Sequence, residues 1–158
     1  MPINIFAYDP GQTTGYCQTV VQDDGFSFEV KECREIAWDE ALPIIGNLFT
    51  WVRKESIVVV ESFHLFPHKA KSQIGSGFPS VRIIGVIETY AYMMGIPPKD
   101  IKYQAPSDIS RVEVLPEHVK MVAGSPHKID AYKHARLYFL KHFYNNPFDS
   151  TTDSRDTS

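Results

Sequence analysis

Two acidic residues end apolar runs at positions where a buried carboxylate needs a partner. Asp9 closes the run "INIFAYD" and precedes Pro10-Gly11, and Glu61 closes "SIVVVE". Desolvating a carboxylate is costly unless a cation or a hydrogen-bond donor compensates it. If the two runs are neighbouring strands, the carboxylates meet at one sheet edge and repel, which raises the pKa of one of them. A hard divalent cation such as Mg²⁺ or Mn²⁺ removes that conflict.

The segment "SPHKIDAYKHARLYFLKHFY" offers further metal ligands. Ser125 is expected to cap a helix whose first residue is Pro126. At about 100° per residue, His127, Asp130 and His134 fall on one face of that helix. This face lies roughly opposite an apolar stripe formed by Ile129, Phe139, Leu140 and Phe143.

Together these residues suit a two-metal centre. Asp9, Glu61 and Asp130 offer three carboxylates, and His127 adds an imidazole. Such a donor set fits two divalent ions ~3.5–4 Å apart, which promote attack of water on a phosphodiester. Each residue also has an ordinary interpretation: Asp9 in a turn, Glu61 as a solvated strand end, Asp130 as a partner of the helix dipole. His134 is interpreted as a structural residue or as a support for a ligand.

The elements that must position these residues begin with three strands. Residues 3–9, 13–22 and 26–36 are expected to form an antiparallel meander, with a hairpin turn at 23–25. A helix capped by Asp39 and running to about residue 54 comes next. The later elements are expected at 56–61 (strand), 80–94 (helix), 101–105 (strand) and from 126 (helix).

This order predicts an α/β fold with a mixed five-stranded sheet, three antiparallel strands then two parallel, flanked by helices. A right-handed crossover sets the fourth strand parallel to the first, so that Asp9 and Glu61 share an edge. The length of 158 residues fits one domain over 1–148. Residues 149–158 are expected to be a disordered polar tail, and 111–124 show no clear pattern.

Composition narrows the class of protein. Apolar runs such as 57–60 are far shorter than the ~20 residues of a membrane span, and no signal-peptide pattern is present. We therefore expect a cytoplasmic protein that is not secreted. Cys17 and Cys33 lack metal-site spacing and are expected to be reduced. The net charge of −3 is not typical of a nucleic-acid binder. Residues 62–87 nevertheless contain no acid and several basic residues: His64, His68, Lys69, Lys71 and Arg82.

Four blocks resemble the RuvC family of Holliday junction resolvases, within the RNase H-like superfamily, and especially its short bacteriophage members. They are "AYDPGQTTGY", "VVVESF", "VRIIGVIETYAYMMGIP" with "QAPSDI", and "HKIDAYKHA". In the first block Thr14 and Gly15 are in register with the family. The matches span residues 3–145 in the family's order.

The resemblance implies an RNase H-like domain that cleaves branched DNA with Mg²⁺ or Mn²⁺, usually as a homodimer. One ion would activate a water and the other would stabilise the leaving 3′ oxygen. Asp9, Glu61 and Asp130 would be the acidic ligands, and His127 would replace a fourth acid. The acid-free loop after Glu61 would then meet DNA. The expected DNA-contacting residues are Phe63, His64, Phe66, Lys69, Lys71, Arg82 and Lys128.

The chain departs from the family at three points. His64 stands where the family has a stacking Phe, the Lys expected shortly after "AP" is absent, and the stretch 106–130 is short. Strict four-way junction specificity and dimer geometry therefore stay open. The main alternative is an RNase H-like nuclease that prefers flaps, forks or RNA-containing duplexes. A second alternative is an actin-like ATPase, because "DPGQTTG" resembles the phosphate-binding turn of that fold, although the fold needs two domains. A third is a non-catalytic DNA-binding module.

Overall fold

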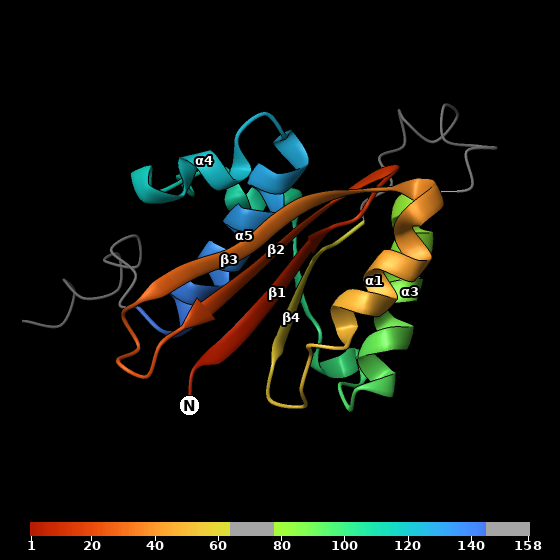
Figure 1. Cartoon of the computed structure of the whole chain (residues 1–158), viewed down its shortest axis with the longest axis horizontal. Helices are drawn as coiled ribbons and strands as arrows, with labels where there is room; N and C mark the ends of the chain where they lie inside the picture. The colour runs from red at the N-terminus through yellow and green to blue at the C-terminus, as the bar shows by residue number, and fades with distance from the viewer. Residues whose placement is uncertain (64–77, 145–158) are drawn as a thin grey trace, which may run out of the picture.

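A five-stranded mixed sheet in the order β3-β2-β1-β4-β5 organises the chain (Figure 1). The computed structural model describes residues 1–63 and 78–144. β1, β2 and β3 pair antiparallel, β4 pairs parallel with β1, and β5 pairs parallel with β4. The predicted fold class is therefore confirmed. The strands are β1 (Ile3–Asp9), β2 (Thr13–Val21), β3 (Phe28–Ala37), β4 (Ile57–Glu61) and β5 (Lys102–Gln104).

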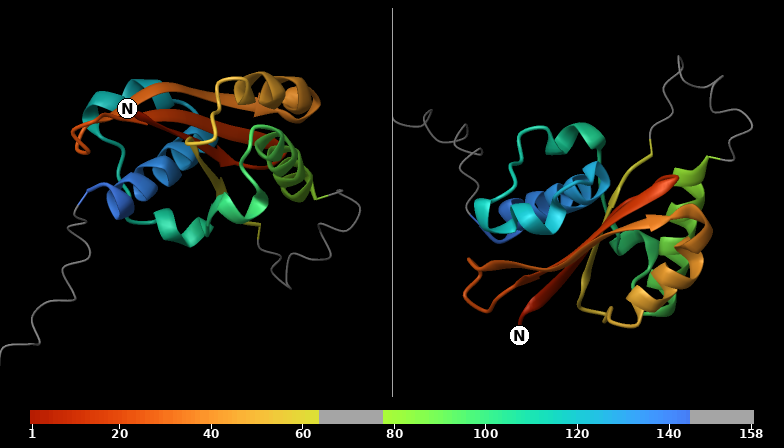
Figure 2. Two further views of the ribbon diagram at one scale, coloured as in Figure 1. Left: turned by 90° about the horizontal axis from the view of Figure 1, so that it is seen from below. Right: turned by 45° about the horizontal axis from the view of Figure 1, so that its top comes forward.

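Helices cover both faces of the sheet. α1 (Ala41–Phe49) and α3 (Pro79–Met93) lie on one face, and α5 (Pro126–His142) lies on the other. In the right-hand view of Figure 2 the strands pass between these two layers. The short α4 (Val119–Val122) packs near β3 and α5. Four 3₁₀ turns complete the described elements: η1 (Trp38–Glu40), η2 (Pro98–Asp100), η3 (Pro106–Ile109) and η4 (Pro116–His118).

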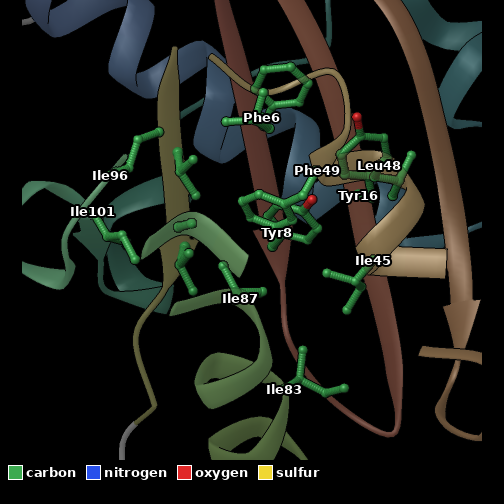
Figure 3. Close-up of a cluster of buried hydrophobic side chains, with 14 of the residues drawn as sticks. Phe6, Tyr8, Tyr16, Ile45, Leu48, Phe49, Ile83, Ile87, Ile96 and Ile101 are labelled. Atoms are coloured by element: carbon green, nitrogen blue, oxygen red, sulfur yellow. The ribbon is translucent and has the colours of Figure 1, made fainter. Parts of the chain in front are cut away.

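Strand alternation carries Asp9 to the α5 face. Successive side chains of a strand point to opposite faces. Phe6 and Tyr8 of β1 enter the apolar cluster under α1 and α3 (Figure 3), whereas Ile5 and Ala7 pack in the cluster under α5. Asp9 continues the second series, so its carboxylate points toward the side on which α5 lies.

The same alternation operates in β4. Val58 and Val60 face α1 and α3, and Val59 faces α5. Glu61 follows two residues after Val59 and therefore emerges on the α5 face. Gln104 of β5 lies opposite Glu61 in the parallel register. Three polar side chains thus reach one face of the sheet at its carboxyl edge.

The start and end of the first helix differ from the prediction. Asp39 caps nothing with its side chain, because it lies inside the 3₁₀ turn η1, whose N-cap is Ala37. α1 follows that turn directly. It ends at Phe49 and not near residue 54. Directly after Phe49 the backbone changes to hydrogen bonds that span three residues, such as the one from the Thr50 N–H to the Asn47 carbonyl. In the segment 111–124, where no pattern was visible, η4 and α4 form.

The third strand also begins later than predicted, at Phe28 instead of residue 26. The Asp24 carboxylate accepts hydrogen bonds from the backbone N–H groups of Phe26 and Ser27, both at 2.8 Å. These donors are used within the turn, which lengthens the hairpin loop.

The remaining predictions concern the two cysteines, membrane-spanning helices, and segments that the structure does not describe. Cys17 and Cys33 lie at opposite positions of β2 and β3, and their reduced state stays a prediction. Within residues 1–63 and 78–144 no helix is both long and apolar enough to cross a membrane. The predicted tail 149–158 and the predicted loop residues 64–77 lie outside the described residues.

Candidate metal centre

Three carboxylates from β1, β4 and α5 meet at the carboxyl edge of the sheet. Asp9, Glu61 and Asp130 each offer an oxygen, and these three atoms all lie within 4.8 Å of one another. Asp9 and Glu61 end neighbouring parallel strands, and Asp130 stands in the second turn of α5. The structure thus brings together the three acids that the sequence selects. The described residues hold no second group of three such ligands this close.

Burial and mutual repulsion perturb these carboxyl groups. The pKa of Asp9 rises to about 8, first because the side chain is buried and then because Glu61 and Asp130 lie close by. A hydrogen bond with Glu61 raises the pKa of Asp9 further. Burial and Glu61 also raise the pKa of Asp130. Near neutral pH the raised pKa favours the protonated form of Asp9. Such a donor set fits a hard divalent ion, which relieves the same repulsion.

The chain turns sharply after Asp9, and two hydroxyl groups hold that turn. The Thr14 hydroxyl closes the turn: it donates to the Gly11 carbonyl and accepts from the Gly11 N–H, each at 3.3 Å. The Ser80 hydroxyl, at the start of α3, donates to the Pro10 carbonyl at 2.9 Å. The turn next to Asp9 is therefore held from within β2 and from α3.

His127 lies beside the cluster and not inside it. Its Nδ1 is 3.6 Å from the Asp9 Oδ2, and 41% of its side chain is exposed. It does not belong to the group whose ligand atoms all lie within 4.8 Å of each other. Of the four predicted ligands, the structure gathers three carboxylates and leaves the imidazole at the rim next to Asp9.

His134 is fully buried and bonded to the cluster from behind. Its Nε2 lies 2.8 Å from the Glu61 Oε2, and its Nδ1 lies 2.7 Å from the Gln104 Oε1. Both ring nitrogens thus have protein partners, which agrees with the interpretation of His134 as a support for a ligand. No pattern in the sequence singles out Gln104. No spacing rule connects a residue of β5 with a helix face that begins more than 20 residues later.

Ser125 fixes the start of α5, as predicted. Its Oγ accepts from the Lys128 N–H at 3.1 Å and donates to the Glu35 carboxylate on β3. Glu35 pairs with Gly15 in the β2–β3 register. The cap is therefore tied to the sheet close to the end of β1, and this tie fixes the helix turn that carries Asp130.

Gly15 allows α5 to approach β2 very closely. A Cβ at Gly15 would lie 1.9 Å from the His127 carbonyl oxygen, which is far inside contact distance. Gly15 is also the β2 partner of Asp9. The absent side chain thus lets the first turn of α5 rest against the strand pair at the site.

Three of the seven predicted DNA-contacting residues lie in the described part of the chain. Phe63 is half-buried and meets Phe78 edge to face, with ring centroids 5.9 Å apart. Arg82 is exposed, and its guanidinium lies over the Trp38 ring at 4.9 Å. Lys128 is half-buried in the first turn of α5. The four that lie outside the described residues are His64, Phe66, Lys69 and Lys71.

Comparison with known proteins bears on the fold. No family model matches the chain, and no curated protein matches its sequence. A crystal structure of the fowlpox virus resolvase with its substrate, Holliday junction DNA, has a TM-score of 0.59 at 10% identity, covering 87% of this chain and 99% of that one. A crystal structure of the fowlpox virus Holliday junction resolvase has a TM-score of 0.54 at 10% identity, covering 89% and 98%. The chain therefore shares its fold with this viral resolvase.

Proposed function

We propose that this protein is a divalent-metal-dependent endonuclease that cleaves branched DNA, in the manner of a Holliday junction resolvase. The observation that carries the proposal is the convergence of Asp9, Glu61 and Asp130 within 4.8 Å. The fold supports it, because the fowlpox virus protein that shares this fold was crystallised with junction DNA.

Asp9, Glu61 and Asp130 would hold Mg²⁺ or Mn²⁺, and His127 beside Asp9 is the proposed fourth ligand. When bound, the ions would supply an activated water and stabilise the leaving 3′ oxygen, which leaves a 5′-phosphate and a 3′-hydroxyl. The protein side chains orient the site. Asp9 is only 8% exposed, so its carboxylate is held by packing and does not swing into solvent.

The proposed DNA path runs past the turn that follows Asp9. Phe63 stands two residues after Glu61, and its ring packs against Phe78. We propose that Phe63 stacks on a base where the strands of a branch separate. Arg82 and Lys128 would contact phosphates, which position the duplex without reading its sequence. His64, Phe66, Lys69 and Lys71 complete the proposed DNA-binding set.

We also propose a homodimer, because resolving a four-way junction takes two cuts in different strands. Apolar side chains on the outer surface of the α1 and α3 layer support this: Leu42 is 58% exposed and Val81 is 46% exposed. Light scattering coupled to gel filtration measures the mass directly, and a monomer at all concentrations would contradict the dimer. The bacteriophage source and the location in the host cytoplasm stay predictions.

The test is a panel of labelled substrates with Mg²⁺ or Mn²⁺. It contains four-way junctions, flaps, forks, plain duplex and RNA–DNA hybrid. We expect the unchanged protein to nick four-way junctions faster than plain duplex. Cleavage of flaps, forks or hybrids in preference to junctions would favour the alternative nuclease, and no cleavage of any substrate would overturn the proposal.

Two substitutions in the cluster test the assignment of residues. Asp130→Asn and Glu61→Gln keep the side-chain shape and remove one negative charge each. We expect cleavage to fall by about 10²-fold or more, since a bound metal contributes several kcal/mol to the transition state. Junction binding in a gel shift should persist. Glu55→Gln, at an exposed position after α1, is the control and should keep full cleavage. Equal loss of binding and cleavage would count against the assignment.

A further inference from the structure

We propose that His134, held in turn by Gln104, is a positioning residue that fixes the orientation of the Glu61 carboxylate for a divalent cation. The inference rests on the proposed function, since it concerns the same cation site. It adds two residues that lie behind the carboxylates and contribute no ligand of their own.

The first step is that His134 cannot itself bind the ion. It is 0% exposed, so no path from solvent reaches the ring. Its Nε2 bonds Glu61 at 2.8 Å and its Nδ1 bonds Gln104 at 2.7 Å, so neither nitrogen has a free lone pair. A metal-ligating histidine must present one unprotonated nitrogen to the ion.

The second step concerns the direction of the hydrogen bond to Glu61. An ionised carboxylate only accepts hydrogen bonds, so the Nε2 of His134 must carry a proton and donate it. A bond from a nitrogen donor to a charged carboxylate is one of the stronger protein hydrogen bonds. Because the Glu61 Oε2 is fixed by this bond, rotation of the carboxylate about its last torsion is restricted.

The third step is that Gln104 fixes the ring. Its amide can satisfy Nδ1 in either orientation, since it offers a carbonyl oxygen on one side and N–H donors on the other. Gln104 is buried, and its backbone carbonyl accepts from the N–H of Ser62 at 2.8 Å and from the Ser62 hydroxyl at 3.2 Å. The hydrogen bonds thus run from Gln104 on β5 through His134 on α5 to Glu61 on β4, and β4 and β5 are themselves paired.

As a consequence, contacts from three elements fix the position of the Glu61 carboxylate. β4 supplies Glu61, β5 supplies Gln104 and α5 supplies both Asp130 and His134, one turn apart. Residues that hold metal ligands from behind change metal affinity or activity by about 10–100-fold when they are removed. We therefore expect the same order of effect from His134.

The experiment measures Mn²⁺ binding by titration calorimetry on the full chain without DNA. His134→Gln places an amide N–H near the former Nε2 and keeps a donor to Glu61. His134→Asn places its amide near the former Nδ1 and loses that donor. His118→Asn is the matched control, because His118 is also buried but bonds the Tyr132 hydroxyl through its Nδ1.

We expect His134→Asn to bind Mn²⁺ about 10–100-fold more weakly, and His134→Gln and the His118 control to stay close to the unchanged protein. Equal affinity of His134→Asn and the unchanged protein would overturn the inference. An equal loss in both His134 variants would also overturn it, because the packing of the ring, and not its donor, would then matter.

A second variant covers the case in which His134→Asn fails to fold. Gln104→Met keeps the volume, leaves His134 in place and removes its anchor, so Mn²⁺ affinity should fall in the same direction. Unchanged affinity in a folded Gln104→Met would overturn the inference.

The two proposals fail in different ways. If the Mn²⁺ affinities follow the expected pattern but no DNA is cleaved, the nuclease proposal is overturned and the positioning role of His134 stands. If His134→Asn cleaves DNA normally and binds Mn²⁺ with unaltered affinity, the positioning role is overturned and the nuclease proposal stands.

Discussion

Replacing Asp9 with Asn should stabilise the metal-free protein, although it removes a proposed ligand. In the folded chain the pKa of Asp9 is raised from 3.8 to about 8 by burial and by the charges of Glu61 and Asp130. The folded state therefore holds a proton that the unfolded chain releases at neutral pH. Folding stability contributed by this group is highest below about pH 4 and falls as the pH rises toward 8. Asparagine has no such proton to lose.

The size of the effect follows from the shift. Each pH unit between the unfolded pKa and the working pH corresponds to about 1.4 kcal/mol, so the full penalty at pH 7 is about 4 kcal/mol. Slight separation of the carboxylates and entry of water reduce it. We expect Asp9→Asn to gain about 2–4 kcal/mol at pH 7 in EDTA, which raises the Tm by roughly 5–15 °C for a chain of this size.

Thermal unfolding by circular dichroism checks this at pH 4, 6 and 8 in EDTA. The gain should be close to zero at pH 4 and largest at pH 8. Added Mn²⁺ should then raise the Tm of the unchanged protein more than that of Asp9→Asn, because a ligand stabilises the state that binds it. Glu55→Gln, an exposed carboxylate, serves as control. A Tm for Asp9→Asn at or below that of the unchanged protein at pH 8 would refute the reasoning.

Three further substitutions probe the supports of the site. Gly15→Ala should displace α5 and abolish Mn²⁺ binding and cleavage, because its Cβ would lie 1.9 Å from the His127 carbonyl oxygen; Gly85→Ala, with nothing within 4 Å, is the control. Normal Mn²⁺ affinity in Gly15→Ala would contradict this. Ser125→Ala removes the cap of α5 and the bond to Glu35, so urea unfolding should show a loss of about 1–2 kcal/mol; an unchanged midpoint would count against the cap. Phe63→Ala should weaken junction binding by roughly 5- to 150-fold if the ring stacks on one base, measured by gel shift against Phe26→Ala, an exposed ring on the β2–β3 hairpin. Equal affinity of the two Phe variants would rule out stacking by Phe63.

The sequence predicts the sheet and its acids because those features depend on local patterns. Alternation along β1 and β4 carries Asp9 and Glu61 to one face, and a parallel crossover brings their strand ends together. Ser125 and Pro126 mark the start of α5, which sets the phase of Asp130 on the helix. Apart from the crossover, which joins two distant strands by a general rule of handedness, each of these signals lies within about one turn or one strand of the residue it places.

The sequence-based predictions are wrong where a local turn competes with the predicted helix start or strand start. Asp39 has the side chain of a cap, yet the 3₁₀ turn before α1 places it inside a turn. Asp24 takes the donors of Phe26 and Ser27 and delays β3. Both outcomes depend on small differences between turn types, which similar residues favour almost equally.

Only the tertiary structure decides how the ligands are held. Gln104 and His134 are 30 residues apart, and Glu35 and Ser125 are 90 apart, when they form their hydrogen bonds. Gly15 owes its importance to a backbone carbonyl of another element, which no pattern around Gly15 reveals. The placement of the three acids follows from the periodicity of strands and helices, which is a property of the sequence. Their orientation is set by contacts between elements, which exist only once β5, β4 and α5 have packed.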